Sequence, residues 1–368
     1  MEPIRVLHVI DSLSKGGVES FIMNVYRKIN KSKIQFDFLI RRNTNLYEKE
    51  ISELGGKVYV VSEFPKRIIK NYLETQSVIM DNNYQIIHVH ANSLLYLVPV
   101  IIGKKNKIPS VIMHSHSTQP ASMYYLPIHK INSFYINKLT TKLYSCSNEA
   151  GQWMFGKNKY ELVKNGIDLN QFSYNSNYNK EIRKEFSIAE DELVVGHVGR
   201  FVEAKNHDFI VDIFREVLKQ KPKSKLILVG NGKLENKIKE KVKKYKIQDN
   251  VIFTGIRSDI NNFLCAFDIL LFPSLFEGLG VVLVEAQASG LNSLISDSIP
   301  PEVIILDNVN VMPLANTPEE WANELINFSN KTLKSDINEK LTKSGYNIET
   351  TVKQLENYYL SCIEKSDK

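Results

Sequence analysis

The sequence predicts an α/β protein built from two doubly wound parallel-sheet domains. Three observations support this prediction. The chain has 368 residues, which is too long for one ordinary hydrophobic core. Short runs rich in Val and Ile alternate with helical patterns, as in parallel sheets that are covered by helices on both faces. This alternation stops at the polar stretch 170–180 and then starts again.

The first series of candidate strands lies before the polar stretch. It covers residues 4–10, 35–40, 57–61, 85–90, 109–114 and 142–146. Helical patterns in this half include residues 18–29 and 93–105. The stretch 170–180 (NQFSYNSNYNK) suits an interdomain linker because it is polar throughout.

The second series repeats the arrangement. Its strands cover residues 192–198, 225–229, 250–253, 268–272 and 293–296, and its helices lie near 207–219, 233–246, 259–266 and 279–289. We interpret the Lys-rich helix 233–246 as solvated and amphipathic, with Leu234, Ile238 and Val242 inward. No recognised nucleic-acid module surrounds it, so we expect no nucleic-acid partner. A last helix covers about 347–364, and we place domain boundaries at 1–172, 173–345 and 346–368.

Composition narrows the class of protein. Apolar residues make up 43% and charged residues 24%, the balance of a soluble globular protein. No apolar run approaches the roughly 18 residues that cross a bilayer, and the N-terminus enters a strand without a signal-peptide layout. The three cysteines are scattered and form no metal or disulfide pattern. We therefore expect a cytoplasmic protein.

The first Gly-containing turn of interest follows the first strand. In such sheets ligands bind beyond the carboxyl ends of the strands, so two facing domains would form one deep cleft. Gly16 and Gly17 stand at such an end and open a helix. Adjacent glycines allow a ligand to approach the backbone, and a helix start offers free N–H groups. An ordinary strand-to-helix turn is the alternative.

The second turn runs from Gly199 to Asn206, after the first strand of the second series. Arg200 and Lys205 within it can converge on a diphosphate. Arginine offers a planar fork of donors and lysine a point charge. Two cations alone are weak evidence, but their place at the mouth of the expected cleft strengthens it.

The third turn contains two glutamates at a defined spacing. Glu277 lies in the turn Phe276–Gly280, and Glu285 lies within the apolar helix expected to begin at residue 279. Eight helical positions span roughly 12 Å, comparable with the distance between the two ends of a nucleotide sugar. One acid can then face a sugar and the other a ribose, with the diphosphate between them near the amides of Leu279 and Gly280. An exposed helix position for Glu285 is the alternative, but its apolar neighbours argue against it.

The histidine pair His114 and His116 ends a strand of the first series. No Asp or Cys ligand set accompanies it, so a hydrogen-bond donor to a sugar hydroxyl or phosphate is a better interpretation than a metal site. We interpret His88 and His90 as structural.

Together these residues resemble the retaining glycosyltransferases of family 4, which have the two-domain GT-B fold. The resemblance covers nearly the whole chain and is closest to bacterial enzymes of capsular and exopolysaccharide synthesis. Its most specific element is the E-x7-E spacing of Glu277 and Glu285. The glycine loop at 16–19, the stretch 199–206 and the turn 165–168 (NGID) also match the family's motifs.

The resemblance implies a role for each candidate residue. Arg200 and Lys205 would bind the donor diphosphate, Glu285 the ribose and Glu277 the hexose, and His116 would reach the sugar from the other domain. The catalytic set is therefore His116, Arg200, Lys205 and Glu277. The substrate-binding set is Gly16, Gly17, Gly199, Asn206, Gly255, Ile256, Arg257, Gly278, Leu279, Gly280 and Glu285, with the base resting against 255–257. In the family the last helix crosses back to the first domain.

The implied reaction is retaining transfer of a hexose from a nucleotide diphosphate sugar, preferably UDP-linked, with no metal or other cofactor. Roughly 12 Å between the acids exceeds the 5–10 Å of glycosidase carboxylates. The acceptor would be a glycan or a lipid-linked glycan. Two alternatives remain: a sugar-nucleotide epimerase of the same architecture, and a non-catalytic donor-binding partner subunit.

Residues 121–142 interleave aromatics and Ile with His129, Lys130, Lys138 and Lys142. One interpretation is an interfacial helix at an anionic membrane, which would place the enzyme peripherally on the inner face of the cytoplasmic membrane. A packed amphipathic helix with a basic outer face is the other.

Overall fold

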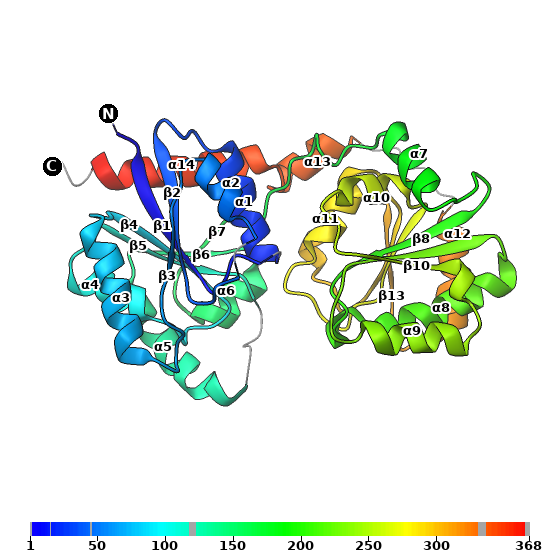
Figure 1. Cartoon of the computed structure of the whole chain (residues 1–368), viewed down its shortest axis with the longest axis horizontal. Helices are drawn as coiled ribbons and strands as arrows, with labels where there is room; N and C mark the ends of the chain where they lie inside the picture. Colours follow the sequence, from blue (N-terminus) through cyan, green and yellow to red (C-terminus); the bar gives the residue numbers. More distant parts are fainter. Residues whose placement is uncertain (1, 15, 45, 118–122, 330–335, 365–368) are drawn as a thin grey trace. The chain divides into compact units, whose positions relative to one another are not determined.

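The chain folds into two compact α/β units, as the fold-class prediction requires (Figure 1). The structure is a computed structural model that describes residues 2–14, 16–44, 46–117, 123–329 and 336–364. One unit comprises Met1–Gly166 and Gly345–Lys368, and the other comprises Ile167–Ser344. Each unit is built around its own parallel sheet.

The first unit contains a seven-stranded sheet of order β3-β2-β1-β4-β5-β6-β7. The chain therefore winds outward in both directions from β1, with a switch point between β1 and β4. The strands are β1 (Ile4–Ile10), β2 (Ile34–Ile40), β3 (Val58–Val60), β4 (Ile86–Ala91), β5 (Ser110–Ser115), β6 (Lys142–Ser145) and β7 (Glu161–Leu162).

Helices cover both faces of this sheet (Figure 1). They are α1 (Gly17–Lys28), α2 (Glu48–Glu53), α3 (Ile68–Asp81), α4 (Val98–Lys105), α5 (Leu126–Leu139), α6 (Asn148–Phe155) and α14 (Ile348–Glu364), with a short 3-10 turn η1 (Met123–Tyr125). Successive strand residues point to opposite faces. On β1, Val6 and Ile10 join the core beneath α1 and α14, whereas Leu7 and Val9 join the core on the opposite face.

The last helix, α14, is part of the core of the first unit. Val352, Leu355 and Tyr359 are buried in the same cluster as residues of β1, β2 and α1. The Thr351 hydroxyl donates a hydrogen bond to the Lys164 carbonyl at 3.0 Å. Figure 1 shows α14 in red beside α1. The first unit therefore needs residues from both ends of the sequence.

The second unit contains a six-stranded sheet of order β10-β9-β8-β11-β12-β13. Its strands are β8 (Leu193–Val198), β9 (Ser224–Val229), β10 (Val251–Gly255), β11 (Ile269–Phe272), β12 (Ser293–Ser296) and β13 (Val309–Met312). Its helices are α7 (Ser176–Glu185), α8 (His207–Gln220), α9 (Glu235–Lys244), α10 (Ile260–Ala266), α11 (Val281–Ala288), α12 (Pro318–Ser329) and α13 (Ile337–Lys343), with 3-10 turns η2 (Glu203–Lys205), η3 (Gln248–Asn250) and η4 (Pro301–Val303). The switch point of this sheet lies between β8 and β11.

Three local predictions need correction. The predicted linker 170–180 is not wholly irregular, because α7 begins at Ser176 and packs on α10. The helix expected at 93–105 begins only at Val98, where Pro99 occupies the first turn. The strands β7 and β13 were not predicted, since β7 has two residues and β13 (VNVM) lacks a continuous apolar run.

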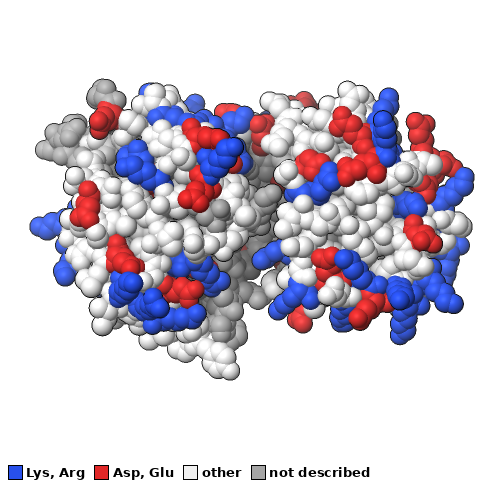
Figure 2. Space-filling view, viewed as in Figure 1, with Lys and Arg blue, Asp and Glu red and all other residues white. Residues whose placement is uncertain are grey.

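The Lys-rich helix α9 has the predicted amphipathic character. Ile238 and Val242 are buried, and Leu234 packs partly against the same core. Its Lys241 bridges Asp208 and Asp212 at 2.6 and 2.7 Å. Figure 2 shows basic and acidic side chains interspersed over the visible face of the second unit.

Among the described helices, none combines the length and the apolar character that a membrane span requires.

We expect Leu355→Ala to lower the free energy of unfolding of the first unit by about 2–5 kcal/mol, because it leaves a cavity beneath α14. Urea denaturation in a Trp321→Phe background measures this, since Trp153 then reports on the first unit alone. Exposed Asn357 on the same helix provides the control, and Asn357→Ala should change stability by less than about 0.5 kcal/mol. Equal effects of both variants would contradict a core role for α14.

Candidate functional site

Two loops of the second unit meet at the carboxyl edge of its sheet. One loop follows β8 and the other follows the neighbouring strand β11. The Leu275 amide donates to the Ala204 carbonyl at 2.8 Å, and the Asn206 side-chain amide donates to the Pro273 carbonyl at 3.1 Å. Asn206 adopts a left-handed conformation (φ 54°, ψ 41°), which Asn tolerates better than most residues. The two loops are therefore held together by backbone and side chain.

An ion pair connects the same loops. Lys205 Nζ lies 2.7 Å from Glu277 Oε1, and the two side chains are only 20% and 10% exposed. The ammonium also lies 4.6 Å from the centroid of the buried Phe272 ring. Two residues predicted for adjacent parts of a donor, its diphosphate and its hexose, thus contact each other directly. The pair lies beside the β8–β11 switch point, where ligands of such sheets bind.

Arg200 differs from Lys205 in having no partner of this kind. It is exposed and forms no ion pair with a described residue. Gly199 before it allows the loop to lie close to Lys205, because a Cβ there would lie 3.2 Å from Lys205 Cδ and 3.0 Å from His197 Nε2. The guanidinium of Arg200 can therefore bind an anion directly, whereas the Lys205 ammonium already has a carboxylate partner.

The turn before α11 begins the helix later than the sequence predicts. Gly280 is the N-cap in a left-handed conformation (φ 79°), so the helix starts at Val281 rather than at residue 279. The estimate of roughly 12 Å between Glu277 and Glu285 assumes a helical rise at every position between them. That assumption is wrong, because residues 277–280 are not helical. Within the described parts of the chain, the amides of Gly278, Leu279 and Gly280 donate no hydrogen bond. They can bind an oxygen anion at the positive end of α11.

Glu285 lies one turn into α11 and is mostly buried. Its carboxyl group forms neither a hydrogen bond nor an ion pair with any described residue. Burial raises the pKa of Glu285 from 4.5 to about 7. A buried carboxyl group without a partner is costly, and hydroxyl groups of a ligand would satisfy it.

The turn 255–257 adjoins the loop after β8 through a glycine that the sequence analysis missed. The Gly230 amide donates to the Gly255 carbonyl at 2.9 Å, and a Cβ on Gly230 would lie 2.2 Å from the Gly199 carbonyl oxygen. Only a glycine fits there. The run Gly230-Asn231-Gly232 directly after a predicted strand was the available signal.

Within that turn the two side chains differ. Ile256 is 54% exposed, whereas Arg257 pairs with Glu185 at 2.7 Å and with Asp259 at 2.8 Å. These carboxylates raise the pKa of Arg257. An exposed apolar side chain offers a surface for a flat ring, and the Arg257 guanidinium is already occupied.

In the first unit Gly16 caps the start of α1, and Gly17 is its first residue. The Ser14 hydroxyl donates to Glu19 Oε1 at 3.0 Å, and a Cβ on Gly16 would lie 2.4 Å from Glu19 Oε2. Gly17 has open space around its Cα. The loop is thus held by Glu19, and Gly17 leaves the backbone accessible at the helix start.

His116 stands directly after β5, at the carboxyl edge of the first sheet. Its Nε2 lies 2.9 Å from Nδ1 of His90, whose Nε2 lies 2.9 Å from Nδ1 of His8. Burial lowers the pKa of His116 to about 3, so the ring is neutral at physiological pH. Sequence reasoning missed His8. Its position on β1 becomes informative only once the structure shows that β1 pairs with β4.

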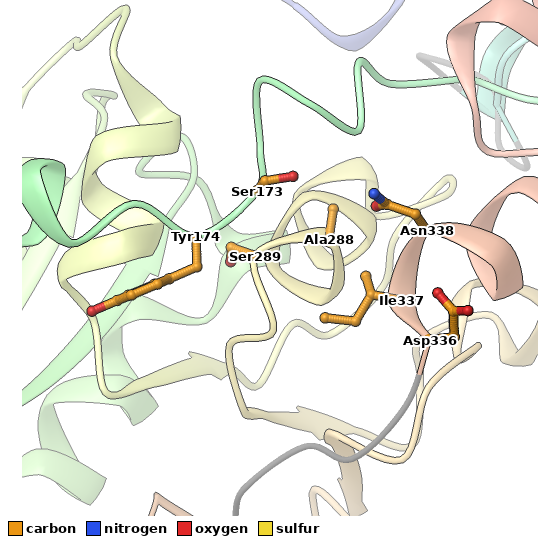
Figure 3. A pocket seen from close by; sticks show the side chains of 7 residues that line it. All are labelled: Ser173, Tyr174, Ala288, Ser289, Asp336, Ile337 and Asn338. Atoms are coloured by element: carbon orange, nitrogen blue, oxygen red, sulfur yellow. The ribbon is translucent and has the colours of Figure 1, made fainter.

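One pocket of the second unit, of about 250 Å³, contains none of the predicted site residues (Figure 3). Its lining comes from the segment before α7, the end of α11 and the start of α13: Ser173, Tyr174, Ala288, Ser289, Asp336, Ile337 and Asn338. Figure 3 labels these seven side chains. The pocket has no charge pattern that suits a diphosphate, so the loops after β8 and β11 remain the candidate site.

We expect Glu285→Gln to stabilise the ligand-free protein above pH 7. The folded protein binds the Glu285 proton more tightly than the unfolded chain does, so wild-type stability falls as pH rises from about 4.5 to about 7. The variant cannot ionise and should gain on the order of 2–3 kcal/mol at pH 8 but almost nothing at pH 4. Urea denaturation in a Trp153→Phe background, followed through Trp321, measures the difference.

Exposed Glu240 on α9 provides the matched control for this change. The difference in unfolding free energy between Glu240→Gln and wild type should be the same at pH 4 and at pH 8. A Glu285→Gln variant with the same stability difference at both pH values would contradict the raised pKa.

Comparison with known proteins identifies both units. Residues 15–171 match the family model "Glycosyltransferase Family 4", and residues 179–348 match "Glycosyl transferases group 1". The glycosyltransferase EpsF of Bacillus subtilis is 33% identical over 98% of this chain and 97% of its own length. A UDP-Gal:alpha-D-GlcNAc-diphosphoundecaprenol alpha-1,3-galactosyltransferase of Escherichia coli is 22% identical over 80% of each chain.

A solved structure shows the same fold. Anabaena HepE, crystallised with UDP and glucose, superposes with a TM-score of 0.78 over 97% of this chain and 100% of its own, at 17% identity. Two parallel-sheet units, the matched family models and a relative of 33% identity along nearly the full chain agree. The chain therefore belongs to the glycosyltransferases of family 4 with a group 1 C-terminal domain, and it is a transferase enzyme of the GT-B fold.

Proposed function

We propose that this glycosyltransferase moves a hexose from a UDP-sugar to a lipid-linked or other glycan acceptor, with retention at the anomeric carbon. The pathway we infer is synthesis of a capsular, exopolysaccharide or other cell-surface glycan. One observation carries the proposal: the loops after β8 and β11 join two cations, free amides and two carboxyl groups at one edge of the second sheet.

The donor diphosphate would bind to the cationic side chains and free amides at this edge of the sheet. Arg200 is unpaired among the described residues, and the amides of 278–280 are free to donate. Lys205 pairs with Glu277, so a diphosphate would share or replace that carboxylate as its partner. Preorganised donors of this kind stabilise the charge that develops on a leaving phosphate.

The two acids would then contact hydroxyl groups. Glu285 is mostly buried and has no described partner, which suits a ribose, while Glu277 beside Lys205 suits the hexose. The base would lie against exposed Ile256.

We propose that the transfer needs no metal, because Arg200, Lys205 and the start of α11 would supply the positive charge. In front-side transfer the leaving phosphate accepts the proton of the acceptor hydroxyl.

A UDP donor is supported by two relatives. HepE was crystallised with UDP and glucose, and the Escherichia coli relative carries UDP-Gal in its name. That relative also uses a diphosphoundecaprenol-linked acceptor, which is the source of our proposal of a lipid-linked acceptor for this chain.

The helix α5 supports contact with the membrane that holds such an acceptor. Exposed apolar side chains of this helix, together with Tyr124 of the preceding turn η1, recur at helical spacing and form what we call the α5 stripe: Tyr124, Ile128, Ile131, Phe134 and Tyr135. Exposed Lys130 and Lys138 lie on the same helix. Aromatic and aliphatic residues beside lysines are typical of helices that lie on anionic bilayers.

Two residues of the predicted basic face do not belong to it. His129 is buried; the Leu94 amide donates to its Nδ1 at 3.1 Å, and its Nε2 donates to the Trp153 carbonyl at 3.1 Å. Burial lowers the pKa of His129, so it carries no charge there. Lys142 pairs with Glu161. The proposed membrane surface therefore consists of the α5 stripe with Lys130 and Lys138.

We expect Lys205→Ala to lower kcat/KM for transfer by at least about 100-fold, because the leaving diphosphate loses its buried cation. Thermal shift against UDP- and GDP-sugars first identifies the donor, since a ligand at 100 times its Kd adds about 2.7 kcal/mol of stability. Transfer is then measured with that donor and a diphosphoundecaprenol-linked glycan.

Lys237→Ala, at an exposed position of α9 in the same unit, is the control and should transfer at the wild-type rate. Full turnover by a folded Lys205→Ala variant would remove the assignment. Conversion of the donor into a second sugar nucleotide without an acceptor would instead indicate an epimerase.

We expect the double variant Lys130→Glu/Lys138→Glu to pellet less with vesicles that contain phosphatidylglycerol, since each lysine near an anionic surface contributes about 1 kcal/mol. Phe134→Ser should weaken pelleting through lost apolar contact. Lys237→Glu/Lys244→Glu on α9 makes the same charge change as a control. Unchanged pelleting of both α5 variants would exclude this surface.

A further inference from the structure

Five of the eight histidines of the chain lie on one face of the first sheet. They occupy alternate positions of three neighbouring strands and of the residue after β5: His8, His88, His90, His114 and His116. This is the face that α1 and α14 cover. All except His116 are less than 9% exposed, and their rings lie nearly parallel or tilted at 4.1–5.4 Å between neighbouring centroids.

The rings form two hydrogen-bonded rows. The first row, His8–His90–His116, is joined by two N···N contacts of 2.9 Å. The second row joins Tyr359 to His88 at 2.7 Å and His88 to His114 at 3.2 Å. The first row ends at the carboxyl edge of the sheet, whereas the second remains in the core.

The first row has a fixed number of protons. Burial lowers the pKa of His8 and of His116 to about 3, and it lowers the pKa of His90 well below 6.5, so all three rings are neutral at physiological pH. Three neutral imidazoles carry three N–H protons and six nitrogens. Two protons lie within the two N···N contacts, which leaves one proton for either His8 Nε2 or His116 Nδ1.

The two ends of the row are not equivalent. His8 Nε2 is buried without a partner among the described residues, and its ring lies 4.1 Å from Phe36 and 5.9 Å from Phe38. An N–H at that end would be a buried donor in an aromatic cluster, which is costly. His116 Nδ1 is also buried and lacks a described partner, but it lies at the carboxyl edge of the sheet, the edge at which ligands of such sheets bind. The proton is therefore favoured at His116 Nδ1.

We propose that His8 and His90 are positioning residues that hold His116 as the neutral Nδ1–H tautomer, so that Nδ1 can donate a hydrogen bond to a hydroxyl or phosphate oxygen of a substrate at this edge of the first sheet. The part that concerns the ligand rests on the proposed function. In this arrangement His8 Nδ1–H donates to His90 Nε2, and His90 Nδ1–H donates to His116 Nε2. A neutral imidazole donor can stabilise charge on a substrate oxygen without itself giving up a proton.

A metal ion is the competing use of these rings. One nitrogen each from His90, His114 and His116 lies within 4.8 Å of the others, and the same holds for His8, His88 and His90. Both nitrogens of His90 already contact other imidazoles at hydrogen-bond distance, so a metal ligand role would require at least one of those contacts to break. The hydrogen-bonded row is the arrangement that the geometry favours.

The tautomer can be tested without a ligand. In full-length protein labelled with ¹⁵N-histidine, one-bond ¹H–¹⁵N couplings identify the protonated nitrogen, and His116→Gln assigns the signal. We expect His116 to carry its proton on Nδ1 across pH 6–8. A proton on Nε2, or stoichiometric binding of Zn²⁺ that shifts the His90 and His116 signals together, would overturn the proposal.

Matched variants on β4 test the positioning role. His90→Leu removes the donor to His116 and should lower kcat/KM with UDP-glucose or the donor identified by thermal shift by about tenfold. His90→Asn places an amide N–H near the same position and should restore much of the activity. His88→Leu removes a buried histidine of the same strand from the second row, and folded His88→Leu should retain wild-type kcat/KM.

Equal loss of activity in His88→Leu and His90→Leu would show a packing effect and overturn the positioning role. Unchanged transfer by His116→Ala would refute the ligand contact proposed for His116. The NMR measurement tests the tautomer separately, because it needs no ligand. The two failures are thus distinguishable.

Discussion

The ion pair between Lys205 and Glu277 is the interaction on which the candidate donor site depends. It joins the loops after β8 and β11, and those loops lie at the switch point of the second sheet. Two charges that are mostly buried must be held in good geometry, or their desolvation outweighs their attraction. The contacts Leu275–Ala204 and Asn206–Pro273 provide that geometry through hydrogen bonds that do not involve either charge.

Around this pair, polar groups without partners mark where a ligand would bind. The exposed guanidinium of Arg200, the amides of 278–280 and the carboxyl group of Glu285 make no ion pair or hydrogen bond with described residues. Buried polar groups without partners are costly, so hydrogen bonds from a ligand would favour binding at the amides and at Glu285, whereas exposed Arg200 would contribute positive charge. Burial raises the pKa of Glu285 for the same reason, because ionising a buried carboxyl group without a partner is costly.

The first unit uses neutral side chains instead of charges. Its buried histidines interact through N···N hydrogen bonds, and burial keeps them uncharged. Tyr359 of α14 contacts one of them, so the end of the chain helps to hold the ring array. Aromatic and lysine side chains of α5 are exposed on another helix of the same unit, where they serve the membrane contact that we propose. Recognition of the sugar and of the membrane would thus use different elements of one unit.

Local patterns in the sequence predict the fold class, nearly all the strands and the chemical groups of the candidate site. Periodicity reveals apolar runs, and glycine at a strand end reveals a turn, because both effects are local. The tertiary structure decided the pairings between distant residues: Lys205 with Glu277 across 72 positions, and His8 with His90 across 82. It also decided that His129 is buried, and that α11 begins after a left-handed Gly280. These features depend on strand order and packing, which bring together residues that no local pattern relates.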